Sequence, residues 1–345
     1  MKLSRRVFLG RSASSMSALP LLLSTSSYSA AASGTKSMGE AKFVNVDGIR
    51  TRYFEGGSGE AMVLIHADHF GETGSCIRWI PIFPSLAAHY HVYAVDKLGM
   101  GLTDNPLSDS GYSMQATIQH IYRFMETLGI ENSHLVGHSR GALPATRIAL
   151  DHQDRVKTLT IFDSNTLAPG DPPPVAPNIR DFGPPPTKDS IRQKLLADRS
   201  TFRKDFITDE YVEAELEVAS HPKLRQAAER LELLRKRFIE RNPEEVRARP
   251  ALANNSGTGW WLYEVKDTTL DMIRAGRLQT PTLIIWGFND PSATYEMAVD
   301  LFQLISKSVD QAQLHFFNQS RHYPFHEYPR EVVDLMVSFT ESVEV

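Results

Sequence analysis

The chain has 345 residues, 41% of them hydrophobic, and a formal net charge of −4. This size suits one large hydrophobic core with at most an inserted subdomain, rather than several independent domains. A weak negative charge without a long basic run argues against a nucleic-acid partner, and the single cysteine, Cys76, excludes an internal disulfide framework.

The first residues have the three parts of an export signal. Paired arginines, Arg5 and Arg6, precede a short apolar segment and then a run of alanines. The apolar segment is too short to span a bilayer. The sequence Ser-Arg-Arg-Val-Phe-Leu at residues 4–9 resembles a bacterial twin-arginine signal. We therefore expect residues 1–35 to be a signal peptide, the twin-arginine translocase to be a partner during export, and the protein to be periplasmic or secreted; a basic disordered tail is the alternative.

From residue 41 onward, segments typical of strands alternate with segments typical of helices. The first two strand segments flank an Asp-Gly dipeptide, which is common in hairpin turns. Later ones are continuous apolar runs, as expected of strands buried on both faces of a sheet. Pro81 and Pro84 must lie at the start of a helix at residues 76–88 or kink it. The expected strands here are residues 41–46, 49–54, 61–67, 90–96 and 156–162, with one more leading into residue 137, and the expected helices are 76–88, 113–128 and 142–150.

The alternation stops at Asp163. The next residues are rich in proline and glycine, and residues 189–247 are charged and helical in character. We therefore expect a core in two parts, residues 41–165 and 273–345, interrupted by a mostly helical insertion at residues 166–272. In the second part, the expected strands are residues 281–287 and 313–317, and the expected helices are 295–306 and 329–342.

The insertion is predicted to form a lid. It contains two adjacent tryptophans, Trp260 and Trp261, which a plain charged surface segment would leave without a role. In a lid, these side chains would either line a substrate pocket or pack the lid against the sheet. Both interpretations remain open from the sequence.

A candidate nucleophile lies in residues 135–141, Leu-Val-Gly-His-Ser-Arg-Gly. The pattern predicts a buried strand, a sharp turn and a helix start, with the oxygen of Ser139 lifted out of the sheet. Gly137 and Gly141 would let the strand and the helix approach closely. Backbone N–H groups at the helix start would lie where negative charge develops during acyl transfer. This motif makes Ser139 the candidate nucleophile.

Two further strand ends supply the partners that such a serine needs. A serine hydroxyl requires a base to take its proton and an acid to orient that base. Asp290 and His322 each follow an expected strand, so both would lie at the carboxyl edge of a parallel sheet, near Ser139. Serine, then aspartate, then histidine is the chain order expected for hydrolases whose nucleophile lies on such a turn between a strand and a helix. His326 is the alternative base, and Asp163, which also ends a strand, is the alternative acid.

Four motifs in this order resemble lid-bearing α/β-hydrolases, a group that includes esterases and the carbon–carbon hydrolases of meta-cleavage products of aromatic rings. The motifs are Gly-His-Ser-Arg-Gly at 137–141, Asp-Lys-Leu-Gly-Met-Gly at 96–101, Trp-Gly-Phe-Asn-Asp at 286–290, and His322 followed by Glu327 and Pro329. The resemblance covers nearly everything from residue 41. It implies an α/β fold with a mostly parallel central sheet flanked by helices, an acyl-enzyme intermediate, a small-molecule substrate, and neither a cofactor nor a metal.

The resemblance also suggests an oxyanion hole made of two backbone N–H groups. Arg140 would supply one, because it follows the nucleophile. The second would come from Asp68, by analogy with relatives that have His-Gly where this chain has His66 and Ala67. The carboxylate of Asp68 either points away from the site or points inward, where it would destabilise an oxyanion.

The expected substrate class follows from the positions at which this chain differs from particular branches of the α/β-hydrolases. Ser139 excludes the haloalkane dehalogenase and epoxide hydrolase branches, which use an aspartate nucleophile. The carbon–carbon hydrolases usually have asparagine before the serine and tryptophan after the catalytic histidine, but this chain has His138 and Tyr323. These two, with Trp260 and Trp261, are substrate-binding candidates. An ester or a lactone is the expected substrate; a carbon–carbon hydrolase and a catalytically inactive binding protein are the alternatives.

Overall fold

The computed structural model describes residues 34–171, 183–253 and 260–343. Nearly all of the predicted signal peptide, residues 1–35, lies outside these ranges. No helix within them is long and apolar enough to cross a membrane.

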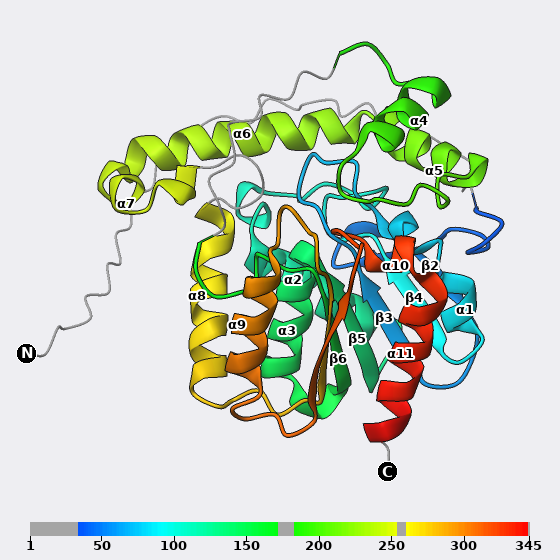
Figure 1. Cartoon of the computed structure of the whole chain (residues 1–345). Coiled ribbons are helices and arrows are strands. Elements are labelled where there is room, and N and C mark those ends of the chain that lie inside the picture. The colour runs from blue at the N-terminus through cyan, green and yellow to red at the C-terminus, as the bar shows by residue number, and fades with distance from the viewer. Residues whose placement is uncertain (1–33, 172–182, 254–259, 344–345) are drawn as a thin grey trace, which may run out of the picture. The chain divides into compact units, whose positions relative to one another are not determined.

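One eight-stranded sheet forms the centre of the fold, in the order β1-β2-β4-β3-β5-β6-β7-β8 (Figure 1). β2 pairs with β1 and with β4 in the antiparallel sense, and all other pairs are parallel. The predicted mostly parallel sheet is therefore confirmed. The strands are β1 (Lys42–Val46), β2 (Ile49–Gly56), β3 (Ala61–Ile65), β4 (His91–Val95), β5 (Ser133–His138), β6 (Val156–Phe162), β7 (Thr282–Gly287) and β8 (Ala312–Phe317).

The two faces of the sheet bury separate sets of side chains because successive residues of a strand point in opposite directions. In β3, Val63 and Ile65 join one hydrophobic cluster, whereas Met62 and Leu64 join the other. All four side chains are at most 1% exposed. This two-sided burial explains the continuous apolar runs in the sequence.

Helices cover both faces (Figure 1). The first cluster includes side chains of α2, α3, α8 (Trp260–Arg274) and α9, and the second includes side chains of α1 and α11. The helix predicted at residues 76–88 is two shorter elements, η1 and α1, because Pro81 lies between them and Pro84 lies in the first turn of α1. The helices outside the insertion are η1 (Cys76–Trp79), α1 (Phe83–Ala87), η2 (Asp109–Gly111), α2 (Met114–Thr127), η3 (Ser139–Gly141), α3 (Ala142–Asp151), η4 (Gln153–Arg155), α9 (Tyr295–Ile305), α10 (Pro324–Glu327) and α11 (Pro329–Val343).

The segment between β6 and β7 contains two kinds of helix. In Figure 1, α4 to α7 lie together beyond one end of the sheet. By contrast, α8 packs against α2, α3 and α9, so it belongs to the layer that flanks the sheet. The predicted insertion at 166–272 therefore spans both kinds. These helices are α4 (Lys188–Ala197), α5 (Asp209–Ser220), α6 (Lys223–Arg241), α7 (Pro243–Ala248), η5 (Pro250–Ala253) and α8 (Trp260–Arg274).

The register of the parallel strands brings the chemically interesting residues to one edge. His138 at the end of β5 pairs with Phe162 at the end of β6, and Gly287 at the end of β7 pairs with Phe317 at the end of β8. Ser139, Asp163, Asp290 and His322 all follow these strand ends. The carboxyl edge of the sheet is therefore the place to look for a site.

Candidate active site

Ser139 lies on a sharp, strained turn between β5 and α3. Its φ is +51°, in the left-handed region that a residue with a side chain rarely adopts. The neighbouring glycines make this turn possible: a Cβ on Gly137 would lie 2.5 Å from Ala142 Cα, and one on Gly141 would lie 2.2 Å from the Ile65 carbonyl oxygen. The close approach predicted from the two glycines is thus present.

Two hydroxyls from the loop after β6 hold this turn. The Ser164 hydroxyl donates to the Ser139 carbonyl oxygen at 2.7 Å, and the Thr166 hydroxyl donates to the same oxygen at 3.2 Å. Both side chains are fully buried. They restrain the backbone of Ser139 from the loop that follows the neighbouring strand, a role that was not predicted from the sequence.

His322 and Asp290 form a close pair. The His322 Nδ1–H group donates to Asp290 Oδ2 at 2.5 Å, which leaves Nε2 free to accept a proton. Asp290 Oδ1 accepts from Ser292 N at 2.7 Å and from Ser292 Oγ at 2.8 Å. Burial raises the pKa of Asp290, but the charge of His322 and these hydrogen bonds outweigh it and hold the pKa below its ordinary value. Asp290 is therefore an anion that can orient and stabilise an imidazolium.

The alternative acid, Asp163, lies behind this pair. Its Oδ1 accepts from Gly287 N at 2.8 Å, and its side chain is fully buried. One carboxylate oxygen of Asp163, one of Asp290 and one ring nitrogen of His322 all lie within 4.8 Å of one another. A cation could also be bound at this spacing. The carboxylate bonded to His322 is nevertheless that of Asp290. The structure thus favours Asp290 as the orienting acid.

The loop that carries His322 is attached to the segment after α4. Glu327, only 1% exposed, accepts hydrogen bonds from Ser320 Oγ and Arg321 N on its own loop, at 2.8 and 2.7 Å. The same carboxylate also accepts from the backbone N–H groups of Phe202 and Arg203.

His322 itself takes part in this attachment. Its backbone N–H donates to the Ser200 carbonyl oxygen at 3.0 Å. The position of the catalytic candidate therefore depends on the insertion, through the Glu327 contacts and through Ser200. In the sequence, Glu327 was notable only for its spacing from His322, and this role could not be recognised there.

His138, one of the substrate-binding candidates, is fully buried. Its Nε2–H group donates to the His322 carbonyl oxygen at 2.8 Å, and its ring centroid lies 4.8 Å from that of His322. The ring also packs against Tyr323 and Phe325. Burial and the neighbouring His322 hold the pKa of His138 well below its ordinary value. The side chain is therefore neutral, and its hydrogen bond attaches the backbone of His322 to the end of β5, one residue before Ser139.

The predicted oxyanion donors Arg140 and Asp68 follow the adjacent strands β5 and β3. Arg140 follows Ser139 in η3, and its side chain donates to Glu72 at 3.3 Å. Asp68 has a φ of +69°, and the Lys97 ammonium donates to its carbonyl oxygen at 2.9 Å. Lys97 is almost fully buried, which lowers its pKa to about 7.

The carboxylate of Asp68 lies against Gly74, where a Cβ would meet Asp68 Oδ2 at 1.9 Å. Burial, and then the negative charge of Asp68, raise the pKa of Tyr323 well above its ordinary value. Tyr323 is also stacked on His326, with ring centroids 4.8 Å apart. The Asp68 carboxylate therefore lies against Gly74, close enough to Tyr323 for its charge to act on the tyrosine hydroxyl.

The two tryptophans have different surroundings. Trp260 stacks on Phe238 of α6, with ring centroids 5.5 Å apart. Trp261 is 6% exposed and packs edge-on against His69 and Phe70, in the loop that follows Asp68. Trp260 thus joins α8 to α6, whereas Trp261 packs on the loop that contains Asp68, the expected oxyanion donor.

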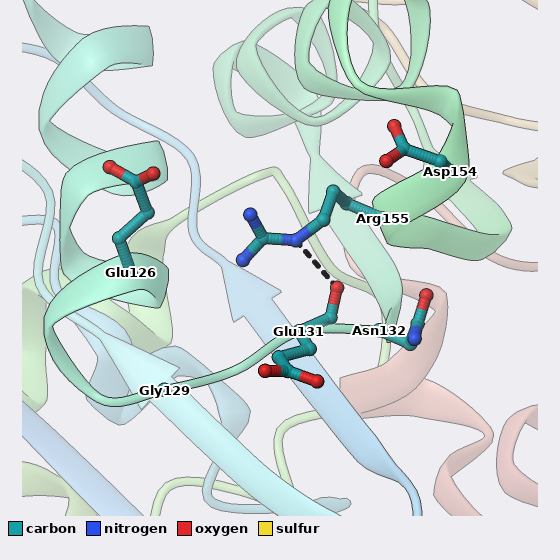
Figure 2. A pocket seen from close by; sticks show the side chains of 6 residues that line it. All are labelled: Glu126, Gly129, Glu131, Asn132, Asp154 and Arg155. Carbon is teal, nitrogen blue, oxygen red and sulfur yellow. Dashed lines mark hydrogen bonds between the residues drawn. The ribbon is translucent and has the colours of Figure 1, made fainter.

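A separate pocket of about 490 Å³ lies at the other end of β5, before its first residue (Figure 2). Arg155 crosses it and donates to the Glu131 carbonyl oxygen at 2.6 Å. Its polar lining contains Glu126, Glu131 and Asp154 but no candidate nucleophile. It is therefore distinct from the site around Ser139.

Comparisons with known proteins agree with this geometry. The family model described as alpha/beta hydrolase fold matches residues 61–329. A 2-hydroxymuconate semialdehyde hydrolase of Pseudomonas sp. (strain CF600) is 26% identical over 85% of this chain and 90% of its own length. A 2-hydroxy-6-oxo-6-(2'-aminophenyl)hexa-2,4-dienoic acid hydrolase of Metapseudomonas resinovorans is 33% identical, but the match spans only 36% of this chain and 43% of that enzyme.

A solved structure has the same fold. The 2-hydroxy-6-oxo-6-phenylhexa-2,4-dienoate hydrolase of Rhodococcus sp. strain RHA1 superposes with a TM-score of 0.65 at 19% identity, over 87% of this chain and 98% of that one.

Proposed function

We infer that this chain, which belongs to the alpha/beta hydrolase fold family, is a serine hydrolase that works through Ser139, His322 and Asp290. The observation that carries the proposal is the strained turn at Ser139, whose preceding residue His138 is bonded to the backbone of His322, a histidine whose Nδ1 is bonded to a buried carboxylate at 2.5 Å. All three positions of the triad are filled, which argues against the alternative of an inactive binding protein.

The chemistry follows from the roles of these groups. His322 Nε2 takes the Ser139 hydroxyl proton while the oxygen bonds to a substrate carbonyl carbon. The resulting oxyanion is stabilised by the backbone N–H groups assigned to Arg140 and Asp68. His322 then gives the proton to the leaving group, and an acyl-enzyme remains on Ser139. Water, deprotonated by the same histidine, releases the acid and restores the serine.

We propose that the bond cleaved is a carbon–carbon bond next to a ketone. The relatives named above are hydrolases of hydroxy-oxo-dienoates or of 2-hydroxymuconate semialdehyde, which supports this alternative over the ester or lactone expected from the sequence. In such a substrate the carbon next to the ketone is the last carbon of the diene, and a proton shift from the 2-hydroxyl group to that carbon gives a 2-keto form. When the bond to the carbonyl carbon breaks in this form, the released electron pair is delocalised as a dienolate, which takes up the proton carried by His322.

An ester or a lactone is the second candidate. It is favoured by His138 and Tyr323, which occupy the positions where carbon–carbon hydrolases usually have asparagine and tryptophan. His138 is buried and neutral, and its side chain is bonded to the backbone of His322. It therefore cannot do what an asparagine side chain facing a substrate would do. The predicted export signal also separates the protein from substrates generated inside the cell.

One comparison of substrates tests the two candidates. We expect kcat/KM for 2-hydroxy-6-oxo-6-phenylhexa-2,4-dienoate to exceed that for 4-nitrophenyl acetate by about a hundredfold or more. Both activities should be lost in Ser139→Ala and kept in the exposed control Ser58→Ala. The opposite ratio would replace the carbon–carbon proposal with the ester hydrolase, and loss in neither variant would overturn the serine mechanism.

We also propose that α4 to α7 form a lid over this site. The hydrogen bonds from Phe202 N and Arg203 N to Glu327, and from His322 N to Ser200 O, support this proposal because they join the insertion to the catalytic loop. The packing of Trp260 on Phe238 supports a second attachment, between α8 and α6.

A further inference from the structure

Asp163 is a buried acid that the mechanism above does not use. It directly follows β6 with a φ of +39°, a conformation that the chain adopts at some cost, and its side chain reaches the end of β7. One of its oxygens, Oδ1, accepts from Gly287 N at 2.8 Å. The other, Oδ2, is buried without a hydrogen-bond partner among the described residues.

An unpaired buried carboxylate oxygen is costly, so the surroundings of Oδ2 decide its state. The neighbouring titratable groups are Asp290 and His322, whose donor atoms lie within 4.8 Å, and Glu327, whose charge also acts on Asp163. His322 is already bonded to Asp290, and within the described part of the chain no ion pair to Asp163 is formed. Two carboxylates that share one site cannot both ionise easily.

We propose that Asp163 is a neutral carboxylic acid that donates its proton in a hydrogen bond to Asp290, making Asp163 a positioning residue behind the Asp290–His322 pair. The hydrogen bond satisfies the unpaired oxygen and leaves a single negative charge between the two acids. Burial first, and then the charge of Asp290, raise the pKa of Asp163 well above its ordinary value, in agreement with this state. Asp163 keeps its proton throughout the reaction, and only His322 transfers one.

The arrangement has two consequences. Asp290 is held from one side by Ser292 and from the other by Asp163, so its carboxylate is fixed in the orientation that His322 needs. In addition, Asp163 is a reserve acid. If position 290 becomes neutral, the charge that opposes ionisation of Asp163 is gone, and Asp163 can become the anion that faces His322.

Substitutions to asparagine test this proposal because they preserve shape. In Asp163→Asn, the amide oxygen can still accept from Gly287 N and the amide nitrogen can still donate to Asp290. We expect kcat/KM to stay within about threefold of wild type, with the acidic limb of its pH profile unmoved. Asp163→Ala, which removes the donor, should lower kcat by about tenfold or more.

A double-mutant cycle tests the reserve role. Asp290→Asn should keep a residual rate because Asp163 ionises in its place. Adding Asp163→Asn to Asp290→Asn should remove at least about another tenfold, although the same change costs little in wild type. Equal effects of Asp163→Asn in both backgrounds would overturn the reserve role.

The catalytic arms rest on the proposed function, so one measurement is made without substrate. Isotope-edited infrared spectra at neutral pH should contain a carboxylic-acid C=O band that Asp163→Asn removes. Absence of that band, or a stoichiometric metal ion in the purified protein, would overturn the proposal even if Ser139 proves to be the nucleophile. A shift of the acidic limb to lower pH in Asp163→Asn would overturn it as well, since such a shift would mean that the substitution had removed a negative charge from the site.

Discussion

Replacing Glu327 with glutamine breaks the contact between the insertion and the loop of His322. The carboxylate accepts from two donors on each side: Phe202 N and Arg203 N at Oε1, and Ser320 Oγ and Arg321 N at Oε2. An amide has one acceptor oxygen, so its NH₂ group must face one of these donor pairs. Hydrogen bonds to a charged group contribute about 1.5–3 kcal/mol each, and buried donors left unpaired add to the loss. We therefore expect Glu327→Gln to lower the free energy of unfolding by about 3 kcal/mol or more.

The activity of Glu327→Gln should fall with its stability, and mainly in kcat, because the His322 loop loses an anchor. Denaturant unfolding and steady-state kinetics on the same preparation measure both quantities. The matched control is Glu331→Gln in α11, where the side chain is exposed and the stability should change by no more than about 0.5 kcal/mol. If Glu327→Gln behaves like this control, the attachment through Glu327 is wrong.

Three further predictions concern other parts of the chain. Replacing Arg5 and Arg6 with lysines should keep the precursor in the cytoplasm, as measured by cell fractionation; unchanged export would reject the twin-arginine signal. Trp261→Ala should destabilise the fold by about 3–5 kcal/mol, because Trp261 is 6% exposed and packs on Phe70 in the loop after Asp68. The substitution should also reduce kcat/KM for esters of all chain lengths alike. An uneven change in kcat/KM at unaltered stability would instead show that Trp261 forms a wall of the substrate pocket. The pKa of Lys97 falls from 10.5 to about 7 on folding, so the folded state releases its proton first. Its contribution to stability is therefore full above pH 10.5 and is lost as the pH falls toward 7. The free energy of urea unfolding should therefore rise in wild type relative to Lys97→Met as the pH rises across this window.

Much of the fold could be predicted because its signals are local. The apolar run at residues 156–162 coincides with β6, and the expected helix at 113–128 is α2 with Ser113 as its N-cap. The Ser113 hydroxyl accepts from Ala116 N, as a helix start requires. The helix expected at 76–88 was wrong as one element because two prolines act within a few residues of each other.

The supports of the site could not be predicted because they come from distant segments. Ser164 and Thr166 hold Ser139 from the next strand, and Glu327 meets the backbone of Phe202 across 125 positions of sequence. Serine and threonine are common loop residues, and nothing in their local pattern indicates which carbonyl they bind. The pairing of Asp290 with His322 was predictable from strand ends, but the position of Asp163 behind that pair needed the register of β6 and β7.

Covalent labelling with a fluorophosphonate tests the central claim most directly, since the reagent reacts with a serine only when a base activates it. Wild-type protein should carry one label, and peptide mapping should find it on Ser139. Ser139→Ala should remain unlabelled and His322→Ala should label far more slowly, with the folded state of both variants checked by thermal unfolding. A label on another serine, or equal labelling of Ser139→Ala, would contradict the assignment of this chain as a serine hydrolase that acts through Ser139.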